Sequence, residues 1–197
     1  MTTVDVWHVD TREVDTGELP GGADRARFAA GVALRRIVTR RLGGREGRWV
    51  RGPNGKPALD GERLQFNLSH AGDLALIAVT DERPVGVDLQ DLVPGLDFAA
   101  MARRFFPPAE ADLVARRGAG EFARLWARKE AVVKAAGGRL TRGLSLPVAG
   151  DAPPPVEHDG VVYAVADLAA PDGFRAAVAL AGPAPFVIRF LPWKPLP

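Results

Sequence analysis

The chain has 197 residues, of which 47% are hydrophobic and 25% charged, as in an ordinary soluble protein with one domain or two small halves. It contains no cysteine, which excludes disulfides, thiol catalysis and thiolate metal sites and is compatible with a reducing cytoplasm. The net charge is only +2, but the high isoelectric point reflects an excess of arginine, which weakly favours an acidic ligand. No apolar run approaches the roughly 20 residues of a membrane span, and the first residues lack the positive region of a secretory signal, so we expect a cytoplasmic protein.

Helical patterns occur in four places along the chain. Asp24 is a good N-cap for a helix that runs to about Leu42, where two glycines end it. A second long helix is expected over Gly120–Gly138, which has no proline and a glycine exit. Two shorter helices are expected over Leu96–Phe105 and Ala109–Arg116, with Pro108 in the first turn of the latter.

Strand patterns fill most of the remaining chain. The order of helix and strands, then helix and strands, is compatible with two similar α+β halves joined near Pro84, with residues 1–84 and 85–197 as their bounds. The expected strands are Val4–Val9, Leu64–Ser69, Leu74–Thr80, Val85–Gln90, Val161–Asp167, Phe174–Leu180 and Phe186–Phe190.

The strand Val85–Gln90 carries oxygen ligands on one face. Alternation places Gly86, Asp88 and Gln90 together on that face, with the glycine leaving room beside the two polar side chains. Carboxylate and amide oxygens on a rigid strand suit Mg²⁺, which commonly binds one or two carboxylates plus substrate phosphates and water. The alternative is an edge strand with one wet face.

The expected helix Gly120–Gly138 carries a stripe of chemically active side chains. Trp126, Glu130 and Lys134 follow one another at intervals of four residues, so a carboxylate and an ammonium stand one turn apart above an indole. A solvated Glu–Lys pair would have the same spacing. Only four of the 26 basic residues are lysine, and three of them, at positions 56, 129 and 134, lie in motifs, which favours phosphate contact from a flexible stem.

Four motifs in order resemble the signature of the 4′-phosphopantetheinyl transferases of the Sfp-like, surfactin-synthetase-activating type. They are Gly55-Lys56-Pro57, Phe66-Asn67-Leu68-Ser69-His70, the G-V-D-L-Q segment at Gly86, and W-A-R-K-E-A-V-V-K-A from Trp126 to Ala135. The resemblance implies a fold of two α/β halves related by a pseudo-twofold, with the active site between them, and no partner subunit is needed to complete that site, so we expect a monomer.

The resemblance also implies the reaction. It is the Mg²⁺-dependent transfer of 4′-phosphopantetheine from coenzyme A to a serine of an acyl- or peptidyl-carrier protein, as in polyketide or nonribosomal peptide biosynthesis, with release of 3′,5′-ADP. The metal would be held by Asp88, Gln90 and Glu130, and Glu130 and Lys134 would act in catalysis. Coenzyme A would be bound by Arg27, Lys56, Pro57, Ser69, His70 and Lys134.

Three of these assignments have plainer alternatives. The segment Arg51–Leu59 could be only a hairpin turn, His70 could be a satisfied polar residue at a strand end, and Arg27 could belong to a solvated helix face. Gln90 departs from the family, because many Sfp-like sequences have a third carboxylate there. A neutral amide oxygen is expected to bind Mg²⁺ more weakly or through water.

Two other functions remain open at this point. One is a different Mg²⁺-dependent enzyme that acts on a coenzyme A or a nucleotide diphosphate. The other is a basic binding module, for example for nucleic acid, suggested by the arginines of the first helix. The sequence lacks aromatic platforms interleaved with basic residues, so we expect no nucleic-acid partner.

Overall fold

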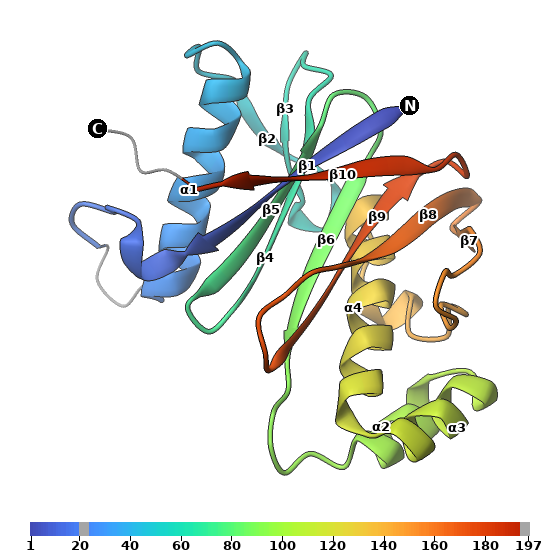
Figure 1. Ribbon diagram of the computed structural model, residues 1–197. Helices are drawn as coiled ribbons and strands as arrows, with labels where there is room; N and C mark the ends of the chain where they lie inside the picture. The colour runs from blue at the N-terminus through green and yellow to red at the C-terminus, as the bar shows by residue number, and fades with distance from the viewer. Residues whose placement is uncertain (20–23, 194–197) are drawn as a thin grey trace.

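The computed structural model describes residues 1–19 and 24–193 and shows two four-stranded sheets, each covered by a helix (Figure 1). The first sheet has the strand order β10-β1-β5-β4, and β1 is antiparallel to β5 but parallel to β10. A strand from the end of the chain therefore completes the sheet that begins the chain. Its strands are β1 (Thr2–Asp10), β4 (Gln65–Ala71), β5 (Leu74–Thr80) and β10 (Phe186–Pro192).

The second sheet is antiparallel throughout, with the order β6-β9-β8-β7. Its edge strand β6 is the one that carries the expected oxygen ligands. The strands are β6 (Val85–Asp91), β7 (Val156–His158), β8 (Val161–Leu168) and β9 (Phe174–Ala181). A separate two-stranded hairpin is formed by β2 (Trp49–Arg51) and β3 (Pro57–Leu59), so the hairpin interpretation of Arg51–Leu59 is correct at the level of backbone.

The helices begin and end where capping residues allow. Helix α1 (Arg25–Arg41) starts after Asp24, whose carboxylate accepts a hydrogen bond from the Arg27 backbone N–H at 3.1 Å. Helix α2 (Phe98–Phe105) starts two residues later than expected, because Asp97 caps it through the Ala100 N–H at 2.8 Å. The other elements are α3 (Pro108–Arg117), α4 (Ala119–Ala136) and the 3₁₀ turns η1 (Thr11–Glu13), η2 (Pro53–Gly55) and η3 (Leu140–Arg142).

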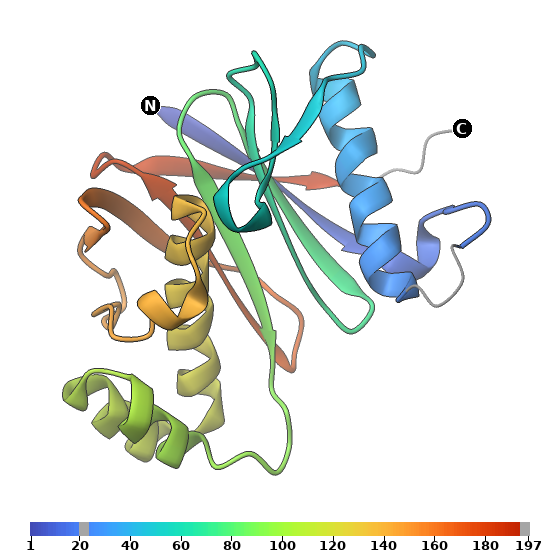
Figure 2. The same cartoon turned by 180° about the vertical axis from the view of Figure 1, so that it is seen from behind.

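Three buried clusters give the molecule four layers, and the view from behind shows the two long helices on opposite outer sides (Figure 2). Helix α1 packs its alanines against the outer face of the first sheet. Between the sheets, Val4 and Leu76 of the first meet Val87 and Val178 of the second. Helix α4 covers the outer face of the second sheet, and α2 and α3 pack against α4 beside its N-terminal end. The mixed α/β class that the sequence predicts is confirmed.

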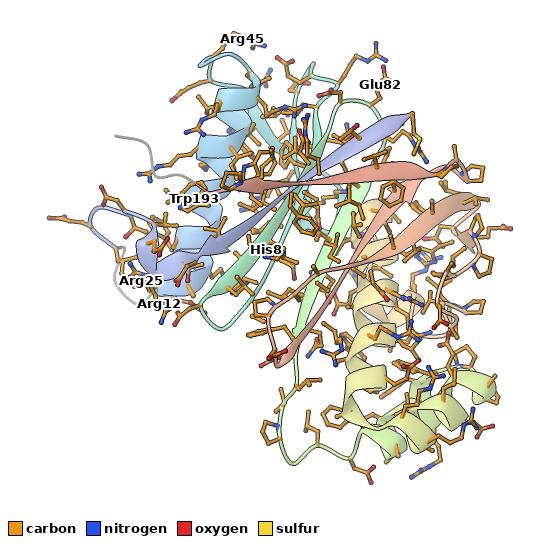
Figure 3. All side chains as sticks on the ribbon, in the orientation of Figure 1. His8, Arg12, Arg25, Arg45, Glu82 and Trp193 are labelled. Atoms are coloured by element: carbon orange, nitrogen blue, oxygen red, sulfur yellow. The ribbon has the colours of Figure 1, made fainter. Side chains whose placement is uncertain are left out.

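Arginines supply much of the surface charge. Arg25 at the start of α1 lies beside Arg12 (Figure 3), and its guanidinium donates to the Thr11 carbonyl at 3.0 Å. Some of these arginines therefore hold protein carbonyls.

Within the described residues, no helix combines the length and the apolar character that crossing a bilayer requires.

Candidate functional site

Two polar side chains of β4 join the sheets where β4 and β6 lie side by side. The Asn67 Oδ1 accepts the Val87 N–H at 2.9 Å, and the Ser69 Oγ accepts the Leu89 N–H at 3.2 Å. Because β4 and β6 belong to different sheets, these side chains take the place of a backbone ladder and satisfy buried N–H groups of β6. Sequence reasoning missed the role of Asn67, although strand alternation places it on the same face as Ser69.

The Ser69 hydroxyl is also the first member of a cluster around Asp88. It donates to Asp88 Oδ1 at 2.9 Å, while the Lys134 ammonium donates to the same oxygen at 2.6 Å and to Ser69 Oγ at 3.0 Å. Glu130 lies one turn back along α4, with its Oε2 3.8 Å from Lys134 Nζ and its Oε1 3.1 Å from the Trp126 indole N–H. Strand β4, strand β6 and helix α4 therefore meet at one group of side chains.

Gly86 permits α4 to come this close to β6. A Cβ at this position would lie 2.0 Å from the Ala131 carbonyl oxygen and 2.4 Å from the Ala135 nitrogen, distances that real Cβ atoms essentially never show. The helix backbone thus rests directly on the strand at the glycine. As a result Asp88, two residues further along the same face of β6, reaches the side chains of α4.

The surroundings of the Glu130 carboxylate shift its pKa in both directions. Burial raises the pKa of Glu130, and the negative charge of Asp88 raises it further, while Lys134 and the Trp126 indole act in the opposite direction. Asp88 is only 4% exposed, and its Oδ2 is buried without a hydrogen-bond partner in the described structure. An orphaned carboxylate oxygen beside a second carboxylate is suited to a cation.

A divalent cation fits this donor set, with few protein ligands. Among the residues that the structure describes, no three His, Cys, Asp or Glu side chains gather closely enough to form a metal site. Asp88 and Glu130 supply two hard oxygens, and substrate phosphates and water commonly complete such a shell for Mg²⁺. Gln90 lies on the same face of β6 as Asp88, but its amide nitrogen donates to the Asp91 carbonyl at 3.2 Å and to Asp91 Oδ1 at 3.3 Å.

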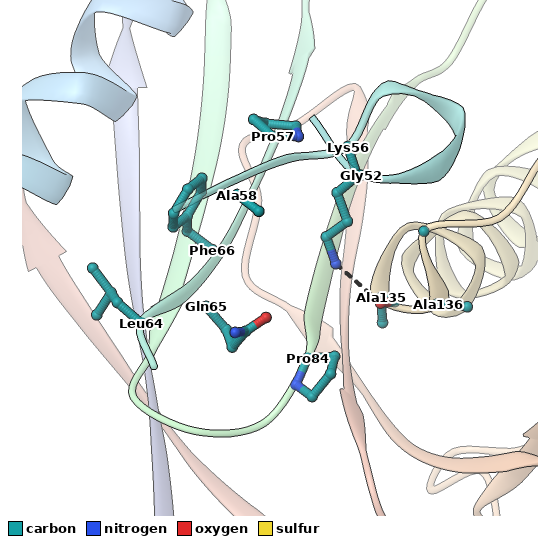
Figure 4. Close-up of a pocket in the computed structure, with 11 residues that line it drawn as sticks. Gly52, Lys56, Pro57, Ala58, Leu64, Gln65, Phe66, Pro84, Ala135 and Ala136 are labelled. Carbon is teal, nitrogen blue, oxygen red and sulfur yellow. Dashed lines mark hydrogen bonds between the residues drawn. The ribbon is translucent and has the colours of Figure 1, made fainter. Parts of the chain in front are cut away.

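Lys56 and Pro57 lie at the other end of the contact between β6 and α4. The Lys56 ammonium donates to the Ala135 carbonyl at 3.0 Å (Figure 4). It also donates to the Val85 carbonyl at 3.0 Å. Burial lowers the pKa of Lys56 to about 8. Pro57 opens β3, and both residues line a largely apolar pocket of about 210 Å³.

Among the residues that the structure describes, the remaining predicted ligands of coenzyme A, Arg27 and His70, are not bonded to the Asp88 cluster. Neither Arg27 nor His70 makes a hydrogen bond or ion pair with it in the described structure. Arg27 is exposed in the first turn of α1. His70 follows Ser69 on β4, and alternation turns it to the opposite face, which it shares with Leu68 next to the α1 core.

Lys129 corrects the expectation that the motif lysines all suit phosphate contact. Its side chain is fully buried, its ammonium lies 2.5 Å from Glu110 Oε2, and it also donates to the Leu146 carbonyl. Glu110 in turn accepts the Val148 N–H at 2.6 Å. This lysine therefore fastens the segment after α4 to α3. The helical spacing contained the signal, because position 129 lies off the stripe of 126, 130 and 134.

Comparison with known proteins points to one family. Residues 84–164 match the family model of the 4′-phosphopantetheinyl transferase superfamily. The 4′-phosphopantetheinyl transferase HetI of Nostoc sp. is 36% identical over 171 residues, which are 80% of this chain and 72% of HetI.

Two other similar proteins are matched over less of their length. The 4′-phosphopantetheinyl transferase AcpT of Salmonella typhimurium is 36% identical over 126 residues, 61% of this chain and 64% of AcpT. The protein slr0495 of Synechocystis sp., whose name gives the same activity provisionally, is 36% identical over 132 residues, 62% of this chain and 54% of slr0495. The segments that carry β6 and α4 lie inside the matched family region, and the chain belongs to the 4′-phosphopantetheinyl transferase superfamily.

Proposed function

We propose that this protein transfers the 4′-phosphopantetheine arm of coenzyme A to a serine of an apo acyl- or peptidyl-carrier protein and releases 3′,5′-ADP. Membership of the superfamily supports the reaction class. The observation that carries the proposal is the buried, unpartnered Oδ2 of Asp88 beside Glu130, with the Lys134 ammonium 2.6 Å from the other Asp88 oxygen. Two carboxylates and one ammonium at a single point are what a reaction on a pyrophosphate requires.

The reaction exchanges one phosphorus–oxygen bond for another. The serine oxygen bonds to the phosphorus that bears pantetheine, and the bond from that phosphorus to the bridging oxygen breaks, so 3′,5′-ADP leaves with the bridging oxygen. Glu130, directly or through a water molecule, accepts the serine proton. In the metal-free protein, burial raises the pKa of Glu130, which makes its carboxylate a stronger base than a solvated one.

Asp88 and Glu130 would hold the metal, with the amide oxygen of Gln90 as the third proposed ligand. Bound Mg²⁺ would neutralise pyrophosphate charge that develops on the leaving group. Ser69 fixes the Asp88 carboxylate through its 2.9 Å hydrogen bond. Lys134 would give the pyrophosphate one of its three N–H donors. Arg27, Lys56, Pro57, Ser69 and His70 stay our proposed contacts for the remainder of coenzyme A.

We extend the proposal to the architecture. The pseudo-twofold halves, 1–84 and 85–197, are supported by two sheets of four strands that each carry one long helix on the outer face. Strand β10 comes from the second half in sequence but adds to the first sheet, so the second half contributes one strand to the first. The Asp88 cluster lies where β4 of one half contacts β6 of the other.

Intact mass spectrometry of a panel of apo carrier proteins, each incubated with coenzyme A, Mg²⁺ and this protein, tests the function. We expect one carrier or more to gain the mass of a single phosphopantetheine, with 3′,5′-ADP released in equal amount. Release of another nucleotide product would indicate a different Mg²⁺-dependent enzyme. Absence of transfer to every carrier, including type I and type II acyl carriers and peptidyl carriers, would contradict the proposal.

The structure provides little for a nucleic-acid binding module. Several arginines of the first helix are engaged by the protein: Arg25 donates to the Thr11 carbonyl at 3.0 Å, Arg36 to the Asp15 carbonyl at 2.8 Å, and Arg41 pairs with buried Asp5. Arginines that hold carbonyls and a buried carboxylate are not free to follow a phosphate backbone.

A further inference from the structure

The loop of residues 52–57, on the first half, caps the C-terminal end of α4, on the second. The last carbonyls of a helix have no partner within the helix. Here Lys56 Nζ donates to the Ala135 carbonyl at 3.0 Å, and Asn54 Nδ2 donates to the Gly137 carbonyl at 2.9 Å. Arg139 Nε completes the contact by donating to Asn54 Oδ1 at 3.0 Å. The carbonyls at the end of this helix are therefore satisfied by Lys56 and Asn54, which precede their partners by 79 and 83 positions in the sequence.

The electrostatics of this contact favour a cation. The C-terminal end of a helix carries partial negative charge, so an ammonium is stabilised there. The Lys56 side chain points along the pocket toward the last turn of α4, as Figure 4 shows. Its pKa of about 8 leaves it mostly protonated at neutral pH. Hydrogen bonds from a charged donor are shorter and stronger than those from a neutral one.

The same ammonium also holds strand β6. It donates to the Val85 carbonyl at 3.0 Å, so a single group bridges β6 and α4. Val85 directly precedes Gly86, where the helix backbone rests on the strand, and Ala135 directly follows Lys134. The bridge therefore lies next to the two elements that set the 2.6 Å contact between Lys134 and Asp88.

We infer that Lys56 is a positioning residue, which holds the end of α4 in register on β6 and thereby aligns Lys134 and Glu130 with Asp88. This inference rests on the proposed function for its kinetic part, and its structural part is independent of it. An ammonium has three donors, and two of them bond to carbonyls, so one remains for a phosphate. Lys56 can thus contact coenzyme A and couple that contact to the placement of α4.

The test compares three variants of the full-length protein. Lys56→Met keeps most of the packing volume and removes the donors, and Lys56→Arg restores a cation with several donors. Arg51→Met is the matched control, because Arg51 is an exposed cation of the same hairpin that makes no side-chain hydrogen bond or ion pair in the described structure. Amide hydrogen exchange is measured without ligand over residues 85–91 and 130–137, followed by kcat and KM for coenzyme A.

For Lys56→Met we expect faster exchange in both segments and a fall in kcat of about tenfold or more, since small misplacements of reacting groups are costly. We expect Lys56→Arg to recover much of both properties and Arg51→Met to match the wild type. Unchanged exchange together with unchanged kcat and a raised KM would overturn the inference, because Lys56 would then be a ligand contact alone.

The design separates the two proposals. If the wild type transfers nothing to any carrier, the proposed function fails, and the exchange data still decide whether Lys56 holds α4 on β6. If Lys56→Met does not fold, Lys56→Arg and Lys56→Gln supply the comparison. Exchange and kcat that are equal to wild type in Lys56→Gln would again contradict the positioning role.

Discussion

Replacing Gly86 by alanine is the sharpest perturbation of the site that involves none of its reacting groups. The new methyl group would start 2.0 Å from the Ala131 carbonyl oxygen and 2.4 Å from the Ala135 nitrogen. Both are backbone atoms of a packed helix, so neither can rotate aside. Reaching even the 3.0 Å below which such contacts essentially never occur requires α4 and β6 to separate by at least 1.0 Å.

A shift of that size exceeds what the site can absorb. The hydrogen bond from Lys134 Nζ to Asp88 Oδ1 is 2.6 Å, and an equal lengthening would take it past the 3.5 Å limit of a hydrogen bond. Overpacking a well-packed interior typically destabilises a protein by about 1–3 kcal/mol. Misplacing a reacting group by about 1 Å can lower the rate about 100-fold. We therefore expect Gly86→Ala to remain folded, with a lower melting temperature and kcat reduced about 100-fold.

Thermal unfolding and carrier modification by intact mass measure the two effects. Gly31→Ala is the matched control, because a Cβ at Gly31 in α1 meets no atom within 4 Å. Alanine in a helix is favoured over glycine by about 0.5–1 kcal/mol, so this variant should be as stable as the wild type or more so. Wild-type stability and wild-type kcat in Gly86→Ala would refute the close approach of α4 to β6.

Four further predictions concern individual side chains. Asp88→Asn and Glu130→Gln should each reduce carrier modification more than about 100-fold without lowering the melting temperature, since each removes a proposed metal ligand; near-normal turnover would remove the metal site. Gln90→Glu should lower the half-saturating Mg²⁺ concentration, because a hard cation gains more from a charged oxygen, and no shift would mean that the side chain faces away from the metal. Lys129→Met should cost about 3–5 kcal/mol of stability by leaving its buried carboxylate partner unpaired, which denaturant unfolding would show, and an effect confined to KM would restore a phosphate role. The pKa of Lys56 is about 8 in the folded protein and roughly 10.4 for an unfolded lysine, so between these values the folded protein binds fewer protons than the unfolded one. The free energy of unfolding of the wild type should therefore rise relative to that of Lys56→Met from pH 8 to 10. A difference that does not change with pH would contradict the lowered pKa.

The local parts of the site followed from sequence because they depend on short spacings. The stripe of Trp126, Glu130 and Lys134 needs only a helix, and the indole and ammonium do meet Glu130, at 3.1 Å and 3.8 Å. The alternation that separates Asp88 from the inner face of β6 needs only a strand, and Val87 is indeed buried between the sheets. Capping signals are equally local, which is why the start of α1 was correct to one residue.

The contacts that alternation could not identify are those between elements distant in sequence. A period of two tells which face of β4 holds Asn67 and Ser69, but not that β6 lies against that face. The same limit applies to Lys56, which the family resemblance suggested as a ligand of coenzyme A and which also bonds to carbonyls 29 and 79 residues away. Burial and partner choice for such side chains come from packing, which no local pattern contains.

By itself the sequence determined the four helices and the seven longer strands, the mixed α/β class, the family resemblance and the carboxylates and lysine that we propose carry the chemistry. Each of these depends on residue type and on spacing within one helix or strand. Only the tertiary structure decided that β10 completes the first sheet, that α4 rests on Gly86, and that Lys129 is buried with a carboxylate while Lys134 reaches Asp88. The physical reason is that a side chain's direction is local, whereas what it meets is set by close packing of segments far apart in the chain.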